Sequence, residues 1–256
     1  MSILGKLSKI KSLLIAKGKK HTYVQMIMIF VVIGGLVISA NTFTGSSRID
    51  SITVEGNLIV PDKEYFDCLT IFDSPKPNVT LSQIKEEIKS HPYVDDIELY
   101  HKSSGRVVVE IVEKRPIAIL VGSDGNFDYV DSDGNILAYK VYRNSESLPL
   151  IRKINLGEKK SASKLESAVR LIKSLKNYKD KALYEQTSEI IYDRTVDGFN
   201  IIFGDHSKKV CMGSNRNIDD KMEKLSAYYR QHLIKGNKEI ASLDLRWANQ
   251  LIVKKQ

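Results

Sequence analysis

The sequence is poor in cysteine. Its 256 residues include two, Cys68 and Cys211, which lie far apart in the chain. Small exported domains that depend on disulfides carry more cysteines at closer spacing, so a disulfide-rich scaffold is excluded. Each cysteine stands among apolar or turn residues, which favours a small core side chain over a crosslink, and pairing of the two is left open.

Sequence motifs of the common enzyme and metal-binding classes are also missing. The five histidines are scattered, and there is no HExxH, Cys-x-x-Cys, G-x-S-x-G, P-loop or G-x-G-x-x-G sequence. Asp131–Asn135 begins like a calcium loop, but its glycine stands at the fourth position instead of the sixth, so Asp133-Gly134 indicates a hairpin turn. We therefore assign no catalytic, cofactor-binding or metal-binding residue, and we expect no cofactor and no small-molecule substrate.

Acidic residues are absent from the first 47 positions, which contain six lysines. The formal net charge of +8 belongs mainly to this tail, because the rest of the chain is close to neutral. The net charge therefore does not indicate a nucleic-acid-binding surface on the body of the protein. We therefore expect no nucleic-acid partner.

A long uncharged stretch follows this basic tail. The 27 residues between Lys20 and Arg48 carry no charge, and as a helix they would span roughly 40 Å, more than the ~30 Å hydrocarbon core of a bilayer. We predict a cytoplasmic basic tail at residues 1–22 and a transmembrane helix at residues 23–44, with the remainder extracytoplasmic by the positive-inside rule. A cleaved signal peptide is the alternative, because Ile38-Ser39-Ala40 weakly resembles a cleavage site.

Residues 48–121 predict the order strand, helix, helix, strand, strand. The segment "SITVEGN" favours a strand closed by a turn, and the apolar positions of "DKEYFDCLTI" follow helical spacing. Thr80 and Gln83 form a capping-box pattern that opens the second helix. The segments "VDDIELYH" and "RVVVEIVEK" predict strands separated by a small-residue turn. Two helices on one face of a three-stranded sheet would bury these apolar positions.

Residues 122–256 predict a second α+β layer. Strands are indicated by "FDYVD", "NILAYKV", "SEIIYD" and "FNIIFG", and Asp197-Gly198 marks a turn between the last two. Two further segments carry apolar residues at helical spacing. In the first these are Leu165, Ala168, Val169, Ile172 and Leu175, and in the second Ile218, Met222, Leu225, Tyr229 and Leu233.

Several of these segments resemble a known family. The pieces "ITVEGN", "HPYVDDIEL" and "VVVEIVEKRPIAIL" are similar to the POTRA module of the bacterial division proteins FtsQ and DivIB, while "DYVDSDGNIL" and "SLDLRWANQLIVKK" resemble the opening and closing of that family's β domain. The resemblance implies an α+β fold: a single N-terminal transmembrane helix, a POTRA domain at 48–121 and a mixed β domain with two flanking helices at 122–256. Two departures occur, since Trp247 replaces the usual Tyr and the following turn lacks a Gly.

The resemblance also implies a function. Members of this family are non-enzymatic scaffolds of the division septum in the cytoplasmic (inner) membrane, and they link divisome components through their extracytoplasmic domains. The implied mechanism is β-strand addition of an FtsB/FtsL-type coiled-coil partner at the C-terminal edge. The partner-binding residues that it implies are Trp247, Gln250, Leu251, Ile252, Val253, Lys254 and Lys255.

The role of Trp247 is left open between an interface anchor and a core or hairpin-packing side chain, because Leu243 and Leu245 share its face of the strand. Two other functions are alternatives to the scaffold. One is a POTRA-containing outer-membrane assembly or translocation factor, although no long series of alternating ten-residue strands follows. The other is an anchored cell-wall enzyme whose site is built from scattered residues.

Overall fold

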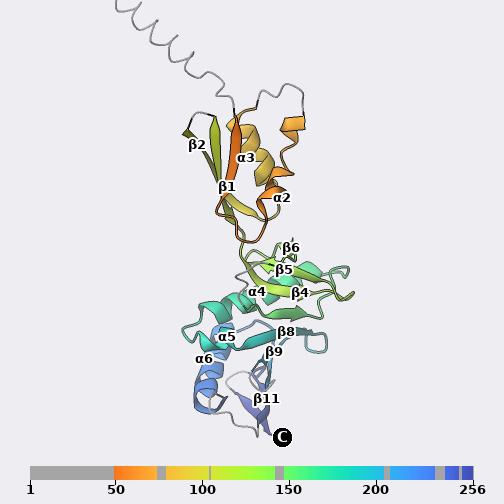
Figure 1. The fold of residues 1–256 in the computed structure, drawn as a ribbon. Helices are drawn as coiled ribbons and strands as arrows, with labels where there is room; N and C mark the ends of the chain where they lie inside the picture. The colour runs from red at the N-terminus through yellow and green to blue at the C-terminus, as the bar shows by residue number, and fades with distance from the viewer. Residues whose placement is uncertain are drawn as a thin grey trace, which may run out of the picture.

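The structure, a computed structural model, describes residues 49–73, 79–103, 105–141, 147–204, 208–233, 240–247 and 250–255 (Figure 1). The predicted cytoplasmic tail at 1–22 and the predicted transmembrane helix at 23–44 lie outside the described residues. Within the described residues, no helix has both the length and the apolar content needed to span a bilayer.

The described chain is a mixed α+β fold with two separate sheets. Its elements in order are β1 (Ser51–Glu55), α2 (Asp62–Phe66), the 3-10 turn η1 (Thr70–Asp73), α3 (Leu81–Lys89), β2 (Val94–Ser103), β3 (Arg106–Glu113), β4 (Pro116–Val121), β5 (Phe127–Asp131), β6 (Ile136–Ala138), β7 (Leu150–Arg152), α4 (Ser161–Asn177), α5 (Ala182–Glu185), β8 (Thr187–Asp193), β9 (Gly198–Phe203), β10 (Lys208–Gly213), α6 (Ile218–Tyr228), the π-helical turn η3 (Tyr229–Leu233), β11 (Ile240–Asp244) and β12 (Ile252–Lys255).

The first sheet has three strands in the order β1-β3-β2, with β1 parallel and β2 antiparallel to β3. The predicted capping box opens α3: Thr80 Oγ1 accepts from the backbone N–H of Gln83 at 3.3 Å, and the Thr80 N–H donates to Gln83 Oε1 at 3.0 Å. Ile84 and Ile88 of this helix are buried in the hydrophobic cluster of the first unit. The strand and helix order of this unit is the one that the sequence predicts.

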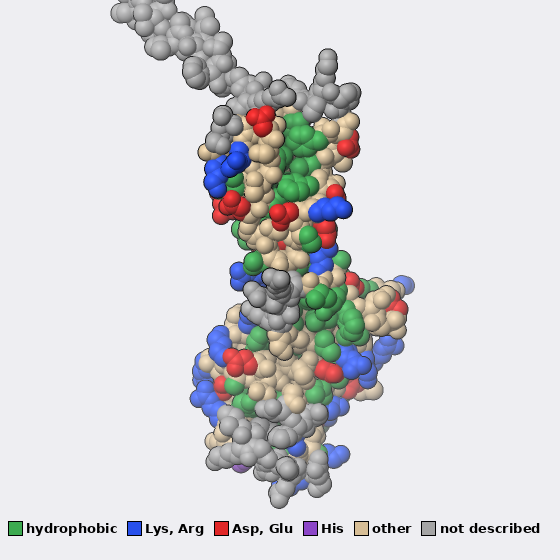
Figure 2. Space-filling model, viewed as in Figure 1, with side chains coloured by type: hydrophobic (Ala, Val, Ile, Leu, Met, Phe, Trp, Pro, Cys, Tyr) green, Lys and Arg blue, Asp and Glu red, His purple; other side chains and the backbone are tan. Residues whose placement is uncertain are grey.

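The second sheet has nine strands in the order β12-β11-β10-β9-β8-β7-β4-β5-β6. The helices α4 and α6 pack against it, and the five apolar residues predicted for α4 are all buried in its core. The predicted hairpin turn at Asp133-Gly134 joins β5 and β6, which pair antiparallel. Basic and acidic side chains are interspersed over this unit on the face drawn in Figure 2.

One strand belongs to a different sheet from the one expected. The sequence interpretation places Pro116–Val121 in the first unit, but β4 pairs with β5 and β7 of the larger sheet. Alternation of apolar residues identifies a strand but does not show which strands it pairs with. The run "VVVEIVEKRPIAIL" therefore gives no sign that the chain passes from one sheet to the other. The sheets change at Lys114–Arg115, and we place the division between the two units there instead of after residue 121.

The two units are docked on each other. Tyr129 and Leu137, from the second sheet, are buried in the hydrophobic cluster of the first unit. Two polar contacts also cross the junction: the Tyr93 hydroxyl donates to the Ala138 carbonyl, and Lys140 Nζ lies 2.6 Å from Glu64 Oε2. Figure 1 shows the result, with the second unit stacked below the first and the C-terminus at the far end. A shared core resists rotation of one unit against the other.

A buried carboxylate closes the first unit beside this junction. Glu113 ends β3, and its Oε2 atom accepts from the backbone N–H groups of Leu58 at 2.8 Å and Ile59 at 2.7 Å. Its Oε1 atom accepts from the Val60 N–H at 2.9 Å and the Tyr65 hydroxyl at 2.7 Å. Burial, followed by the bond to Glu113, raises the pKa of Tyr65, so the phenol keeps the proton that it donates. One side chain thereby satisfies four donors, three of which are buried.

We expect Glu113→Gln to destabilise the protein by roughly 2–4 kcal/mol, because an amide keeps one acceptor oxygen and turns an NH2 group toward backbone donors. Chemical denaturation measures the loss in the free energy of unfolding. Glu110→Gln is the matched control, because Glu110 lies exposed on the same strand. Equal stabilities of the two variants would contradict the role assigned to Glu113.

Candidate functional site

The C-terminal segment forms one edge of the nine-stranded sheet. β11 runs parallel to β10, and β12 pairs antiparallel with β11, with Leu243 opposite Val253 and Asp244 opposite Ile252. Among the described strands, β12 has a neighbour on one side only. An edge strand presents unpaired main-chain N–H and C=O groups along its outer side.

The side chains of this edge divide between the core and the surface. Leu251 and Val253 pack against the main hydrophobic core, whereas Ile252 is 46% exposed. Gln250, Lys254 and Lys255 are exposed. The inward pair fixes the register of β12 on β11, and the outer side chains remain accessible.

Trp247 stands beside the edge on the surface. Leu243 and Leu245 are buried, but Trp247 is 58% exposed. β11 ends at Asp244, so the strand alternation that links these residues in sequence no longer applies at position 247. The alternative of a core tryptophan is therefore wrong. An exposed Trp next to an open strand is a candidate anchor for a partner.

An ion pair shapes the turn between β11 and β12. The Arg246 Nε atom donates to both carboxylate oxygens of Asp244, at 2.9 and 3.0 Å, and the Arg246 backbone N–H donates to Asp244 Oδ1 at 3.0 Å. These bonds lower the pKa of Asp244. The Arg246 side chain passes over Gly213, whose φ of 64° lies in the left-handed region. A Cβ atom built there would lie 2.9 Å from Arg246 Cγ.

Buried lysines hold the strands behind the edge. The Lys208 ammonium donates to the Ile240 carbonyl of β11, and Lys221 of α6 donates to the carbonyls of Met212 at 2.8 Å and Ser214 at 2.7 Å. Burial lowers the pKa of Lys221. These bonds satisfy carbonyls at the end of β10 and tie α6 to the sheet. The position of the edge therefore depends on polar contacts inside the core.

A family model described as FtsQ/DivIB, C-terminal related, matches residues 115–253, which is more than half of the chain. The chain belongs to this family. It is also 26% identical over 180 residues to the cell division protein FtsQ of Geotalea daltonii. That match covers 68% of this chain and 63% of the relative, so it spans less than two thirds of the relative's length.

The resemblance to the FtsQ/DivIB family predicted from sequence is thus confirmed, and the matched region contains most of the candidate edge. The structure brings Trp247 and residues 250–255 together on one border of the sheet. Sequence reasoning missed strand β10 and the contacts of Lys208 and Lys221, because lysines in a strand or helix are normally exposed. It also missed the Asp244–Arg246 ion pair, although two opposite charges two positions apart in the sequence could have indicated it.

A metal site and a reactive cysteine have less support in this chain than the partner edge has. No group of three or more His, Cys, Asp or Glu side chains is placed to hold a metal ion in the described part of the chain. Cys68 and Cys211 are free and half-buried, so they are not paired with each other. Burial raises the pKa of both thiols, which keeps them protonated. These features point away from thiolate chemistry at either cysteine.

We expect Gly213→Ala to cost more stability than Gly134→Ala. Both glycines have positive φ, at 64° and 84°, but a Cβ at Gly134 meets nothing within 4 Å. Gly134→Ala should therefore report the backbone cost alone, about 1 kcal/mol, and Gly213→Ala should add the displacement of Arg246. Thermal unfolding compares the variants, and a smaller loss for Gly213→Ala than for Gly134→Ala would refute the close contact.

Proposed function

We propose that this protein is a non-enzymatic scaffold of the bacterial division septum. Membership of the FtsQ/DivIB family implies a role in cell division. In our proposal a single helix at 23–44 anchors the chain in the cytoplasmic membrane, with the N-terminus inside and the POTRA-type and β units outside. The protein links divisome components through these units, and it binds an FtsB/FtsL-type coiled-coil partner at β12.

The observation that carries this proposal is the position of β12 at the end of the nine-stranded sheet. An extended partner segment that lies beside β12 gains main-chain hydrogen bonds without any rearrangement of the sheet. Ile252 and Trp247 supply exposed apolar contacts next to this edge. Lys254 and Lys255 add positive charge, which favours an acidic segment and discourages pairing between two copies of the edge.

Proline substitution tests which backbone N–H groups of β12 point outward, toward a partner, and which point toward β11. Successive residues of a strand direct their N–H groups to opposite edges, so Ile252→Pro and Val253→Pro remove donors from opposite sides of β12. We expect one variant to lose a bond to β11 and to unfold at a lower temperature. The other should keep its unfolding midpoint and lose at least about tenfold in partner affinity, since roughly 1.4 kcal/mol is tenfold.

The measurements are thermal unfolding and co-purification with the coiled-coil pair. Ile252→Ala and Val253→Ala are the matched controls, because they shorten the side chains and keep the backbone donors. If both proline variants fold and bind the pair with wild-type affinity, the partner does not add a strand at β12.

Trp247→Ala should weaken partner binding by roughly 30-fold, in the range of an interface anchor worth about 2 kcal/mol. Its unfolding midpoint should not change, because the side chain is already 58% exposed. The control is Phe127→Ala, which removes an aromatic ring of similar exposure, 50%, at the other end of the sheet. Loss of binding in both variants, or in neither, would argue against an anchor at Trp247.

A further inference from the structure

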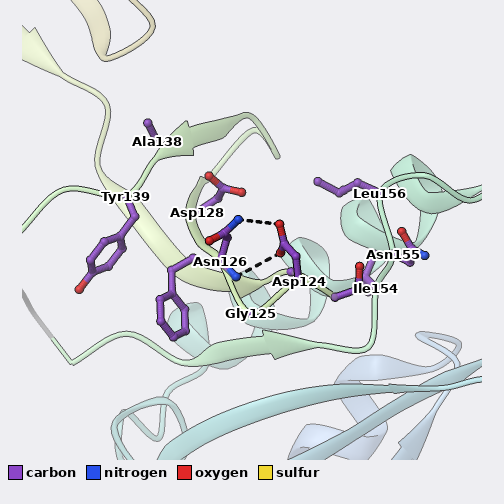
Figure 3. Close-up of a pocket in the computed structure, with 12 residues that line it drawn as sticks. Asp124, Gly125, Asn126, Asp128, Ala138, Tyr139, Ile154, Asn155 and Leu156 are labelled. Carbon is purple, nitrogen blue, oxygen red and sulfur yellow. Dashed lines mark hydrogen bonds between the residues drawn. The ribbon is translucent and has the colours of Figure 1, made fainter.

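A groove crosses the loop end of the larger sheet, away from β12. One hollow, of about 850 Å³, is lined by the β4–β5 turn, by Ala138 and Tyr139 and by residues 154–156. A second hollow, of about 430 Å³, adjoins it and shares residues 122–123 and 154–155 with the first. We call the two together the loop groove. In Figure 3, Tyr139 lies on one side, Asn155 and Leu156 lie on the other, and Asp124 and Asn126 stand between them.

One end of the loop groove carries two aromatic rings. Phe127 is 50% exposed and Tyr139 is 42% exposed, and their ring centroids are 5.9 Å apart. Tyr139 is held from behind by the buried Tyr129, at 4.8 Å between centroids, and the Tyr129 hydroxyl donates to the Lys140 carbonyl at 3.0 Å. A fixed ring with one accessible face is a platform for the flat, apolar face of a sugar ring.

Polar groups that suit hydroxyl and acetamido groups lie beside these rings. Asp124 accepts from the backbone N–H of Asn126 at 3.1 Å and from its side-chain amide at 2.6 Å, and the backbone bond lowers the pKa of Asp124. Asp128 lines the same hollow. Asn155 accepts from the Gly157 N–H with its amide oxygen at 3.0 Å, which leaves its NH2 group as a donor. The residues that line the aromatic end are therefore neutral or acidic, and none of them is basic.

The other end of the loop groove is basic. Arg152, Lys153 and Arg194 are the charged residues that line the second hollow. Arg152 and Arg194 are each partly neutralised by a glutamate, whereas Lys153 has no ion pair within the described part of the chain. Lys153 also has a φ of 64°, a left-handed conformation that is uncommon for a residue other than glycine. Backbone strain of this kind clusters at binding sites.

The loop groove is aromatic and acidic at one end and basic at the other, and this combination favours one class of ligand. Asp124 and Asp128 repel a continuous polyanion at the aromatic end, while the basic end attracts carboxylates. An oligosaccharide with neutral rings and spaced carboxylate substituents satisfies both ends. We propose that the loop groove binds an anionic glycan of this kind, with a sugar ring on Phe127 and Tyr139 and a carboxylate at Lys153 and Arg194.

This site is separate from the proposed partner edge. Four strands, β8 to β11, lie between β7 and β12 in the sheet order, and strands are spaced about 4.8 Å apart, so roughly 24 Å separates β7 from β12. The proposal therefore stands or falls independently of the partner edge.

The test uses the full-length protein in lipid nanodiscs and three probes in calorimetric titrations. A hyaluronan octasaccharide alternates N-acetylglucosamine with glucuronate, chitohexaose is its neutral counterpart, and a 20-residue polyglutamate is an anion without sugar rings. We expect the hyaluronan fragment to bind roughly tenfold more tightly than chitohexaose, because it alone uses both ends of the groove. Polyglutamate should bind more weakly than the hyaluronan fragment.

Two substitutions separate the two ends. Lys153→Gly keeps the left-handed backbone accessible and removes the charge, so it should weaken hyaluronan binding and leave chitohexaose binding unchanged. Phe127→Ala should weaken the binding of both sugars by several-fold to tenfold. Tyr139→Leu preserves packing on Tyr129 and should have the same effect as Phe127→Ala. Trp247→Ala is the matched control and should bind both sugars like the wild type.

Three results would overturn the proposal. The first is the absence of saturable binding of either sugar at millimolar concentration. The second is polyglutamate binding as tight as hyaluronan binding that Phe127→Ala does not change, which would mark a site for an acidic peptide. The third is equal affinity for the two sugars, which would remove the basic end from the site.

Discussion

An open main-chain edge is the constraint on which the proposed function of this structure depends. Buried strands satisfy every N–H and C=O group through their neighbours, and β12 has a neighbour on one side only among the described strands. The edge is nevertheless well defined, because Leu251 and Val253 pack into the core and the Asp244–Arg246 pair shapes the turn that leads to it. Because the edge is already ordered, the protein itself loses little conformational entropy when a partner binds, so the hydrogen bonds that the edge offers translate into affinity.

The rest of the fold fixes the position of this edge relative to the first unit. The shared cluster around Tyr129 and Leu137 joins the second sheet to the first unit, and Glu113 fixes the loop and helix beside the junction. A partner bound at β12, as we propose, would therefore be held at a defined distance and orientation from β1, where the chain enters the described structure. Rigid coupling of this kind suits a scaffold, whose function is to fix one component relative to another.

Local signals in the sequence identified most of the helices and strands, but they did not show which strands pair with each other. The Thr80–Gln83 capping box, the Asp133-Gly134 turn and the buried faces of α4 and α6 follow from short-range patterns, and the structure confirms them. The sheet to which β4 belongs and the exposure of Trp247 depend on where a strand pairs and where it ends. Period-two alternation carries no information on either point.

The resemblance to the family was therefore enough to place the candidate edge in the sequence. The contacts that hold this edge in position are visible only in the structure. Lys208 and Lys221 donate to carbonyls 32 and 9 positions away in the chain, and Gly213 leaves room for the side chain of Arg246, which follows β11. The loop groove is assembled from four connections, each of which looks like an ordinary turn when taken alone. Sites of this type become visible only when the fold has brought the loops together.

Amide hydrogen exchange of residues 252–255, with and without the coiled-coil partner, tests the central claim most directly. In the free protein, we expect the amides that do not bond to β11 to exchange within seconds, while their sequence neighbours are protected by that pairing. Binding of the partner should slow these outward amides by at least about 100-fold, because a new strand would accept their hydrogen bonds. Unchanged exchange at β12 in a saturated complex would contradict strand addition at this edge.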